Sequence, residues 1–181
     1  MLDIGCHCGD FTLAAAQHLG CRSVLGIEID GGLVRQAREA AKLNFPGIQA
    51  VFMCESFMDT AHPTAPLYDV VMCLSVTKWI HFNWGDDGVK ALFAKAFAFL
   101  RPGGVFILEP QPWKSYKAKY AWKEEWKKNY HAIELKPGLF KHHLVGDVGF
   151  ESFEMLTAGL EGSEGFKQKR EVYAFHKGRA Q

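Results

Sequence analysis

Short apolar runs recur along the first two thirds of the chain, separated by stretches with helical spacing. Five of these runs predict β-strands, at residues 2–5, 23–29, 48–54, 68–74 and 105–108. The fourth run is the most continuously apolar, which is typical of a central strand in a parallel sheet. Helical spacing predicts helices at residues 11–19, 32–43 and 89–100. This alternation predicts an α/β fold, in which helices cover both faces of a mostly parallel sheet.

The last third of the chain has a different pattern. Residues 114–130 predict an aromatic and basic helix, and residues 150–157 and 171–176 predict two extended segments. A polar loop joins these segments, so we expect an antiparallel hairpin that closes the sheet. We expect one domain over residues 1–181, and its abrupt start within a strand indicates a truncated N-terminus.

Composition excludes several classes of protein. The hydrophobic share of 48% and the charged share of 23% are those of a globular domain. No run approaches the roughly 18 apolar residues of a membrane span, and the five cysteines are too few and odd in number for a disulfide framework. The net charge of +1 gives no general affinity for nucleic acid, although a local basic patch is compatible with it.

A glycine-rich loop, Gly5 to Gly9, follows the first predicted strand and opens a helix. Glycine allows close backbone approach to a ligand, and Glu28, at the end of the next strand, can accept hydrogen bonds from both hydroxyls of an adenosine ribose. The G-x-x-x-G spacing favours S-adenosylmethionine; an NAD site, or a domain that binds nothing, is the alternative. The turn at residues 101–104 supports the first interpretation, a Rossmann-like class I methyltransferase fold.

The predicted cofactor-binding residues lie in this loop and at the ends of the first four strands. They are Asp3, Gly5, Cys6, His7, Gly9, Glu28, Ile29, Glu55, Ser56 and Leu74. Cys6, His7 and Cys8 have no second Cys/His cluster to complete four ligands, so we expect no metal.

Polar and aromatic residues follow the fourth and fifth strands, at the edge where open α/β sheets bind ligands. The chain resembles the methylphosphate capping enzyme family of the bicoid-interacting type in three segments. These are residues 74–88 (LSVTKWIHFNWGDDG), 100–104 (LRPGG) and 108–113 (LEPQPW). Residues 135–137 and 147–150 share the resemblance.

The resemblance implies methyl transfer to the γ-phosphate of the 5′-triphosphate on a small noncoding RNA such as 7SK. A 5′-monophosphate RNA or a small molecule as acceptor, and a non-catalytic RNA-binding relative, remain alternatives. The resemblance also implies a nuclear location, with a cytoplasmic one as the alternative, and partners in an RNA–protein complex. We expect no membrane association.

A phosphate oxygen is already anionic at neutral pH, so the reaction needs positioning and charge control rather than a strong base. Lys78 is predicted to neutralise phosphate, and His81 and Asn83 to hydrogen-bond it. Glu109 and Gln111 are predicted to orient the acceptor. The predicted contacts to the first nucleotide are Trp113, Lys114 and Tyr116, the two aromatic rings by stacking.

Structural roles compete with these assignments. Trp79 and Phe82 could be core residues, and His81 and Glu109 could serve only as structural hydrogen-bond partners. The segment 114–130 could be an RNA-binding face or a plain amphipathic helix, and a second RNA contact is predicted around Lys167, Lys169 and Arg170.

Overall fold

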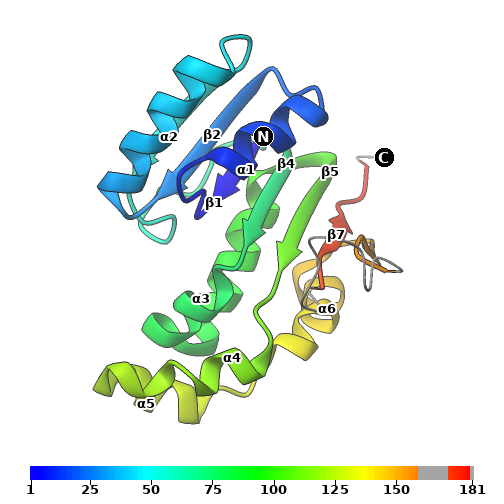
Figure 1. Cartoon of the computed structure of the whole chain (residues 1–181). Helices are drawn as coiled ribbons and strands as arrows, with labels where there is room; N and C mark the ends of the chain where they lie inside the picture. Colours follow the sequence, from blue (N-terminus) through cyan, green and yellow to red (C-terminus); the bar gives the residue numbers. More distant parts are fainter. Residues whose placement is uncertain (159–170, 180–181) are drawn as a thin grey trace.

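The computed structural model describes residues 1–158 and 171–179, shown as a cartoon in Figure 1. The strands are β1 (Leu2–Ile4), β2 (Ser23–Glu28), β3 (Gln49–Cys54), β4 (Tyr68–Leu74), β5 (Leu100–Glu109), β6 (Ser152–Met155) and β7 (Tyr173–His176). The α-helices are α1 (Asp10–His18), α2 (Gly31–Asn44), α3 (Thr77–Phe99), α4 (Trp113–Lys117), α5 (Glu124–Ala132) and α6 (Phe140–His143). The 3-10 turns are η1 (Tyr120–Trp122) and η2 (Pro137–Leu139), and Leu144–Val148 is a π-helical turn.

The described strands form one sheet in the order β3-β2-β1-β4-β5-β7-β6. The first five strands in sequence are parallel, whereas β7 pairs antiparallel with both β5 and β6. The predicted α/β architecture and its C-terminal hairpin are therefore confirmed. The predicted RNA contact around Lys167, Lys169 and Arg170 lies outside the described residues.

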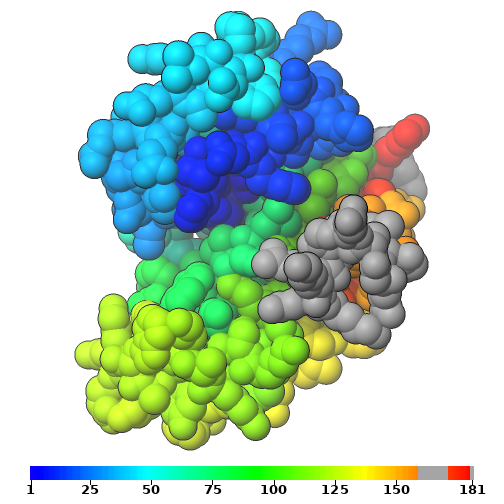
Figure 2. Space-filling view, in the orientation of Figure 1, coloured from blue at the N-terminus to red at the C-terminus, as the bar shows by residue number. Residues whose placement is uncertain are grey.

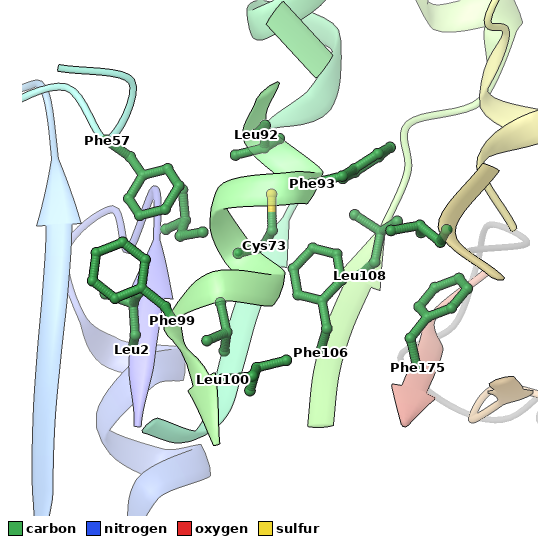
Figure 3. Close-up of a cluster of buried hydrophobic side chains, with 14 of the residues drawn as sticks. Leu2, Phe57, Cys73, Leu92, Phe93, Phe99, Leu100, Phe106, Leu108 and Phe175 are labelled. Atoms are coloured by element: carbon green, nitrogen blue, oxygen red, sulfur yellow. The ribbon is translucent and has the colours of Figure 1, made fainter. Parts of the chain in front are cut away.

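Helices bury both faces of the sheet because side chains of each strand alternate between the faces. On β4, Val71 and Cys73 join the cluster beneath α3, and Met72 joins the cluster beneath α1. Figure 3 shows Phe93 of α3 facing Phe106 of β5 in the larger cluster, with ring centroids 6.2 Å apart. Burial of such aromatic pairs, each worth about 0.5–1.5 kcal/mol beyond its area, fixes α3 on the sheet.

The third helix begins twelve positions earlier than predicted, at Thr77 rather than at residue 89. Gly85 has φ 61° and ψ −157°, which kinks the helix and divides its apolar spacing into two unequal parts. The start of the helix depends on a distant side chain, because Gln111 accepts hydrogen bonds from the hydroxyl of Thr77 and the amide of Lys78. Sequence spacing contains no sign of such a long-range cap.

The predicted single helix over residues 114–130 is wrong, since the segment divides into α4, η1 and α5. Lys123 is extended (φ −136°, ψ 146°) and separates η1 from α5. The fold-back stacks the Tyr130 ring between Trp113 and Tyr120, at centroid distances of 4.9 Å and 4.3 Å. Figure 2 shows the α4–α5 residues, in yellow-green, as a separate lobe below the blue N-terminal residues.

The predicted turn at residues 101–104 is a bulge within β5 rather than a loop before it. Leu100 pairs with Tyr68 and Val105 pairs with Val70, so β5 contains extra residues opposite this part of β4. Gly103 has φ 77° in the bulge. Among residues 1–158 and 171–179, no helix has the length and apolar character needed to cross a membrane.

Candidate functional site

A cavity of about 800 Å³ lies at the carboxyl ends of the central strands. Its lining comes from the loops after β1, β2 and β3 on one side and from the β4–α3 junction on the other. The lining residues are Ile4, Gly5, His7, Ile27, Glu28, Ile29, Leu33, Glu55, Ser56, Phe57, Leu74, Ser75, Val76, Trp79, Ile80, Asn83 and Trp84. Seven of the ten predicted cofactor residues are among them; Asp3, Cys6 and Gly9 are not.

The two glycines of the loop have different roles. Gly5 has φ +76°, and a Cβ there would lie 2.4 Å from Cγ2 of Val76, so only glycine lets the loop approach the start of α3. Gly9 has φ +79° and faces α2, where a Cβ would lie 2.8 Å from that of Ala37. Gly5 therefore shapes the cavity. The predicted cofactor contact for Gly9 is corrected to helix packing, and Cys6 is likewise buried in the core beside α2.

The Glu28 carboxylate is held at the cavity by three backbone amides. Oε1 accepts from the amides of Ile29 (2.8 Å) and Asp30 (3.1 Å), and Oε2 accepts from the amide of His7 (3.1 Å). A carboxylate offers about four acceptor positions, so the free position on Oε2 can take a hydroxyl group. The amide bonds fix the direction in which this carboxylate accepts a ligand.

Asp3 lies beneath the loop rather than in the cavity. Its buried carboxylate accepts a hydrogen bond from the hydroxyl of Thr12. Burial raises the pKa of Asp3 to about 6, the Thr12 hydrogen bond lowers it, and the nearby charge of Glu28 raises it further. Its predicted contact with the cofactor is therefore corrected to a support for the β1–α1 loop.

We expect Asp3→Asn to stabilise the protein increasingly as the pH rises. The pKa of about 6 in the folded state exceeds the ordinary value of 3.8, so Asp3 stabilises the fold below that value and loses this contribution as pH rises through 6. The side-chain amide of the Asp3→Asn variant cannot ionise, so the variant avoids the free-energy cost of a buried charge at high pH. Urea unfolding at a series of pH values, with the exposed Asp10→Asn as control, measures the effect. A stability difference independent of pH would contradict it.

The first turns of α3 provide the opposite wall of the cavity. Trp79, Asn83 and Trp84 line it, and both tryptophans are partly exposed. The amide group of Asn83 is held at both ends: its nitrogen donates to the Trp79 carbonyl (2.8 Å), and its oxygen accepts from Nε1 of Trp126 (3.2 Å). Asn83 therefore reaches the predicted site in a fixed orientation.

His81 and Tyr116 are fully buried, which corrects their predicted contacts with RNA. Nδ1 of His81 lies 2.9 Å from the Tyr116 hydroxyl, and Nε2 lies 3.3 Å from Oδ1 of Asp86. Burial lowers the pKa of His81 to about 4, although Asp86 partly opposes the shift. A neutral imidazole suits both neighbours if Tyr116 donates to Nδ1 and the Nε2 proton faces Asp86.

Gln111 and Glu109 support the β4–α3 junction and do not line the cavity. Gln111 caps the start of α3 and also donates to the carbonyl oxygen of Ser75. Glu109 accepts a hydrogen bond from the Ser75 hydroxyl (3.1 Å). Ser75 has φ 58°, a left-handed conformation that costs roughly 1–3 kcal/mol and needs such support. The structure thus gives Glu109 and Gln111 a supporting role at this junction, and their contact with the acceptor stays a prediction.

The remaining predicted acceptor residues lie outside the cavity lining. Lys78 is 8% exposed, with Nζ 3.5 Å from the Ser115 hydroxyl and 4.8 Å from the centre of the Trp79 ring. Trp113 packs between Tyr116 and Tyr130, and Lys114 is exposed on α4. Contact of these residues with substrate stays a prediction.

Sequence reasoning missed several residues of the site. Trp79 and Trp84 were not among the predicted site residues, although both line the cavity. The signal was the pair of tryptophans directly after a central strand, because large aromatic residues there can face a ligand as well as the core. Among residues 1–158 and 171–179, no group of three or more His, Cys, Asp or Glu side chains is arranged to hold a metal ion.

Comparison with known proteins gives two family matches. The family model described as Bicoid-interacting protein 3 (Bin3) matches residues 68–177, and a methyltransferase domain model matches residues 1–104. A probable RNA methyltransferase of Arabidopsis thaliana is 35% identical, with 97% of this chain and 69% of the relative covered. The U6 snRNA methylphosphate capping enzyme Amus of Drosophila melanogaster is 34% identical, with 96% and 62% covered.

The 7SK snRNA methylphosphate capping enzyme of Homo sapiens is 33% identical over 99% of this chain but only 35% of its own length. The chain thus spans about a third of the human relative and less than two thirds of the fly relative.

Solved structures establish the fold independently. An O-methyltransferase family protein from Burkholderia thailandensis superposes with a TM-score of 0.70 at 13% identity, covering 99% of this chain and 51% of that one. A SAM-dependent methyltransferase from Methanosarcina mazei gives 0.65 at 18% identity, with 99% and 92% covered. The predicted class I methyltransferase fold is confirmed. The family model matches residues 68–177, and the Arabidopsis relative is 35% identical over 97% of this chain. This chain therefore belongs to the Bicoid-interacting protein 3 (Bin3) family.

Proposed function

We propose that this protein transfers a methyl group from S-adenosylmethionine to the terminal phosphate at the 5′ end of a small noncoding RNA. The observation that carries the proposal is a single cavity with two different walls. The Gly5 loop and Glu28 form one wall, and Trp79 and Asn83 of α3 form the other. The relatives named as RNA methylphosphate capping enzymes support RNA as the acceptor.

The first wall fits S-adenosylmethionine. Gly5 lets the loop lie against Val76, where a side chain would collide, and the oriented Glu28 carboxylate can accept a ribose hydroxyl. Glu55, Ser56 and Phe57 border the same space and would surround the adenine. When bound, S-adenosylmethionine supplies an electrophilic methyl group on its sulfonium.

The second wall fits a phosphate at the end of an RNA. Lys78 brings a positive charge beside Trp79, and among the described contacts no carboxylate pairs with its ammonium. Burial, and then the charge of Lys119, lower the pKa of Lys78, so an anion beside it would be favoured. Because the attacking phosphate oxygen is already anionic, the residues need only orient it and balance its charge.

The α4–α5 segment provides aromatic and basic groups for the RNA beyond its end. Trp122 is 62% exposed, and Nζ of Lys119 lies 3.5 Å from the centre of its ring. Lys136 similarly lies over Trp113, at 5.5 Å. Exposed aromatic rings beside lysines suit stacking with bases and attraction to the RNA backbone.

Transfer of a radiolabelled methyl group to short RNAs with different 5′ ends tests the proposal. We expect labelling of RNA that ends in a 5′-triphosphate and no labelling of an otherwise identical RNA with a 5′-hydroxyl. Comparison with the 5′-monophosphate RNA determines which phosphorylated end is preferred. Equal labelling of all three RNAs would overturn the assignment of a phosphate acceptor.

We expect Lys78→Ala to lower the turnover number by about tenfold, the effect of removing one charged contact of about 1.4 kcal/mol, with little change in cofactor affinity. The reason is that Lys78 lies beside the acceptor wall and outside the cavity lining. Steady-state kinetics and cofactor titration measure the two quantities separately. Lys117→Ala, on the exposed face of α4, is the control. Weaker cofactor binding with unchanged turnover would contradict the role of Lys78.

A further inference from the structure

A buried lysine near the C-terminal end of α3 contacts the loop that forms one end of the cavity. Lys95 is 3% exposed, and its ammonium donates to the carbonyl oxygens of Phe57 (2.7 Å) and Met58 (3.3 Å). It also donates to the carbonyl oxygen of Thr60. An ammonium has three N–H donors and no acceptor, so three carbonyl groups satisfy it completely. Lys95 thus ties residues 57–60 to α3.

The loop has the shape of a turn that needs this support. Within it, the Met58 amide donates to the Ser56 hydroxyl (3.2 Å), and the Thr60 hydroxyl donates to the Phe57 carbonyl (2.8 Å). These bonds curve the chain so that neighbouring carbonyl groups face the same ammonium. Burying these groups without a donor would be unfavourable, which explains why a charged side chain occupies this interior position.

Lys95 also fixes the aromatic side chain of the loop. Its Nζ lies 4.9 Å from the centre of the Phe57 ring, and that ring packs on Phe99 with centroids 5.7 Å apart. Burial lowers the pKa of Lys95, whereas the carboxylates of Asp59 and Glu55 raise it. Glu55 and Phe57 both line the cavity, whereas Lys95 does not. Lys95 contacts the carbonyl group and ring of Phe57, and its positive charge attracts the Glu55 carboxylate.

We propose that Lys95 is a positioning residue for the cofactor, holding Glu55, Ser56 and Phe57 in the arrangement that accepts the adenine. The inference rests on the proposed function, since it assumes that S-adenosylmethionine occupies the cavity. Helix α3 then serves both substrates, because its first turns carry Trp79 and Asn83 for the acceptor and its C-terminal part, with Lys95, holds the adenine end. The kink at Gly85 lies between these two parts of α3, so its geometry sets the distance between the two walls.

Lys95→Met tests this role, because methionine has similar length but no donor. We expect S-adenosylhomocysteine to bind about tenfold more weakly, the effect of losing roughly 1.4 kcal/mol of charged hydrogen bonding, while turnover at saturating cofactor stays unchanged. The preference for S-adenosylhomocysteine over S-inosylhomocysteine, which differs only at the base, should also fall. Lys95→Arg retains a charged donor and should recover most of the affinity. Lys90→Met, exposed on the same helix, is the matched control.

Amide hydrogen exchange of the ligand-free protein gives a second measurement, independent of the cofactor. We expect faster exchange at Met58, Asp59 and Thr60 in Lys95→Met and no change in Lys90→Met. If Lys95→Met is too unstable to purify, Lys95→Gln carries the same expectations.

The outcomes separate the two proposals. Wild-type protein that binds no S-adenosylhomocysteine would overturn the proposed function, and the cofactor role of Lys95 with it. Wild-type binding with an equal affinity and base preference in Lys95→Met would overturn the role of Lys95 alone, even if loop exchange became faster. A loss of affinity that Lys95→Arg does not recover would also contradict it.

Discussion

Glu28→Ala should weaken binding of S-adenosylhomocysteine by about a hundredfold. A hydrogen bond to a charged group contributes about 1.5–3 kcal/mol, and each 1.4 kcal/mol corresponds to a factor of ten in affinity. The carboxylate is already oriented by the amides of His7, Ile29 and Asp30, so a ribose hydroxyl meets it without reorganisation. Alanine removes both the acceptor and the group that holds the His7 amide.

Isothermal titration of wild type, Glu28→Ala and the control Glu39→Ala measures this effect. Glu39 is an exposed acid on α2, so the control removes the same charge away from the cavity. Glu28→Gln is informative as well. Both carboxylate oxygens accept hydrogen bonds from backbone amides, so the NH₂ group of glutamine would face an N–H donor and should not restore full affinity. Binding by Glu28→Ala within threefold of wild type would contradict the assigned role.

Asp86→Ala should lower the free energy of unfolding by roughly 1–3 kcal/mol, because it leaves two backbone amides without their acceptor and removes the carboxylate beside the buried His81 ring. Oδ2 of Asp86 accepts from the amides of Glu134 (3.0 Å) and Leu135 (2.9 Å). Oδ1 lies 3.3 Å from Nε2 of His81, a close electrostatic contact rather than an aligned hydrogen bond. One carboxylate thus joins the kinked part of α3 to the segment after α5.

Urea denaturation of Asp86→Ala and of the exposed neighbour Asp87→Ala measures the difference. We also expect methyl transfer to fall in Asp86→Ala at temperatures where the protein is still folded. His81 links Asp86 to Tyr116 of α4, so the loss should loosen the aromatic cluster that supports the acceptor wall. Equal stability of the two variants would show that the network contributes little.

Local sequence features predicted most of the sheet. The apolar run of β4 and the helical spacing of α2 each depend on residues within one strand or a few turns, and both elements are present in the structure. Motif spacing also placed Gly5 and Glu28 at one cavity. These features are short-range or follow from the carboxyl edge of a parallel sheet, so sequence order is sufficient to locate them.

The roles of the polar residues could not be obtained in the same way. His81, Glu109, Gln111 and Tyr116 have the chemistry of a phosphate site, yet the structure uses them to hold the β4–α3 junction and α4. Whether a polar side chain faces a ligand or a buried partner depends on contacts more than thirty positions away. Lys95 is the converse case, since its position among hydrophobic residues gave no hint of three carbonyl partners.

The order of residues was sufficient to establish the α/β class, the cofactor loop and the family resemblance, because strand periodicity, glycine spacing and long motifs are properties of neighbouring residues. Tertiary packing was needed to establish where α3 begins, how residues 114–130 fold back, and which side chains reach the cavity. Burial explains this difference. A polar group inside the protein must find a partner, and that partner is fixed only when distant segments pack together.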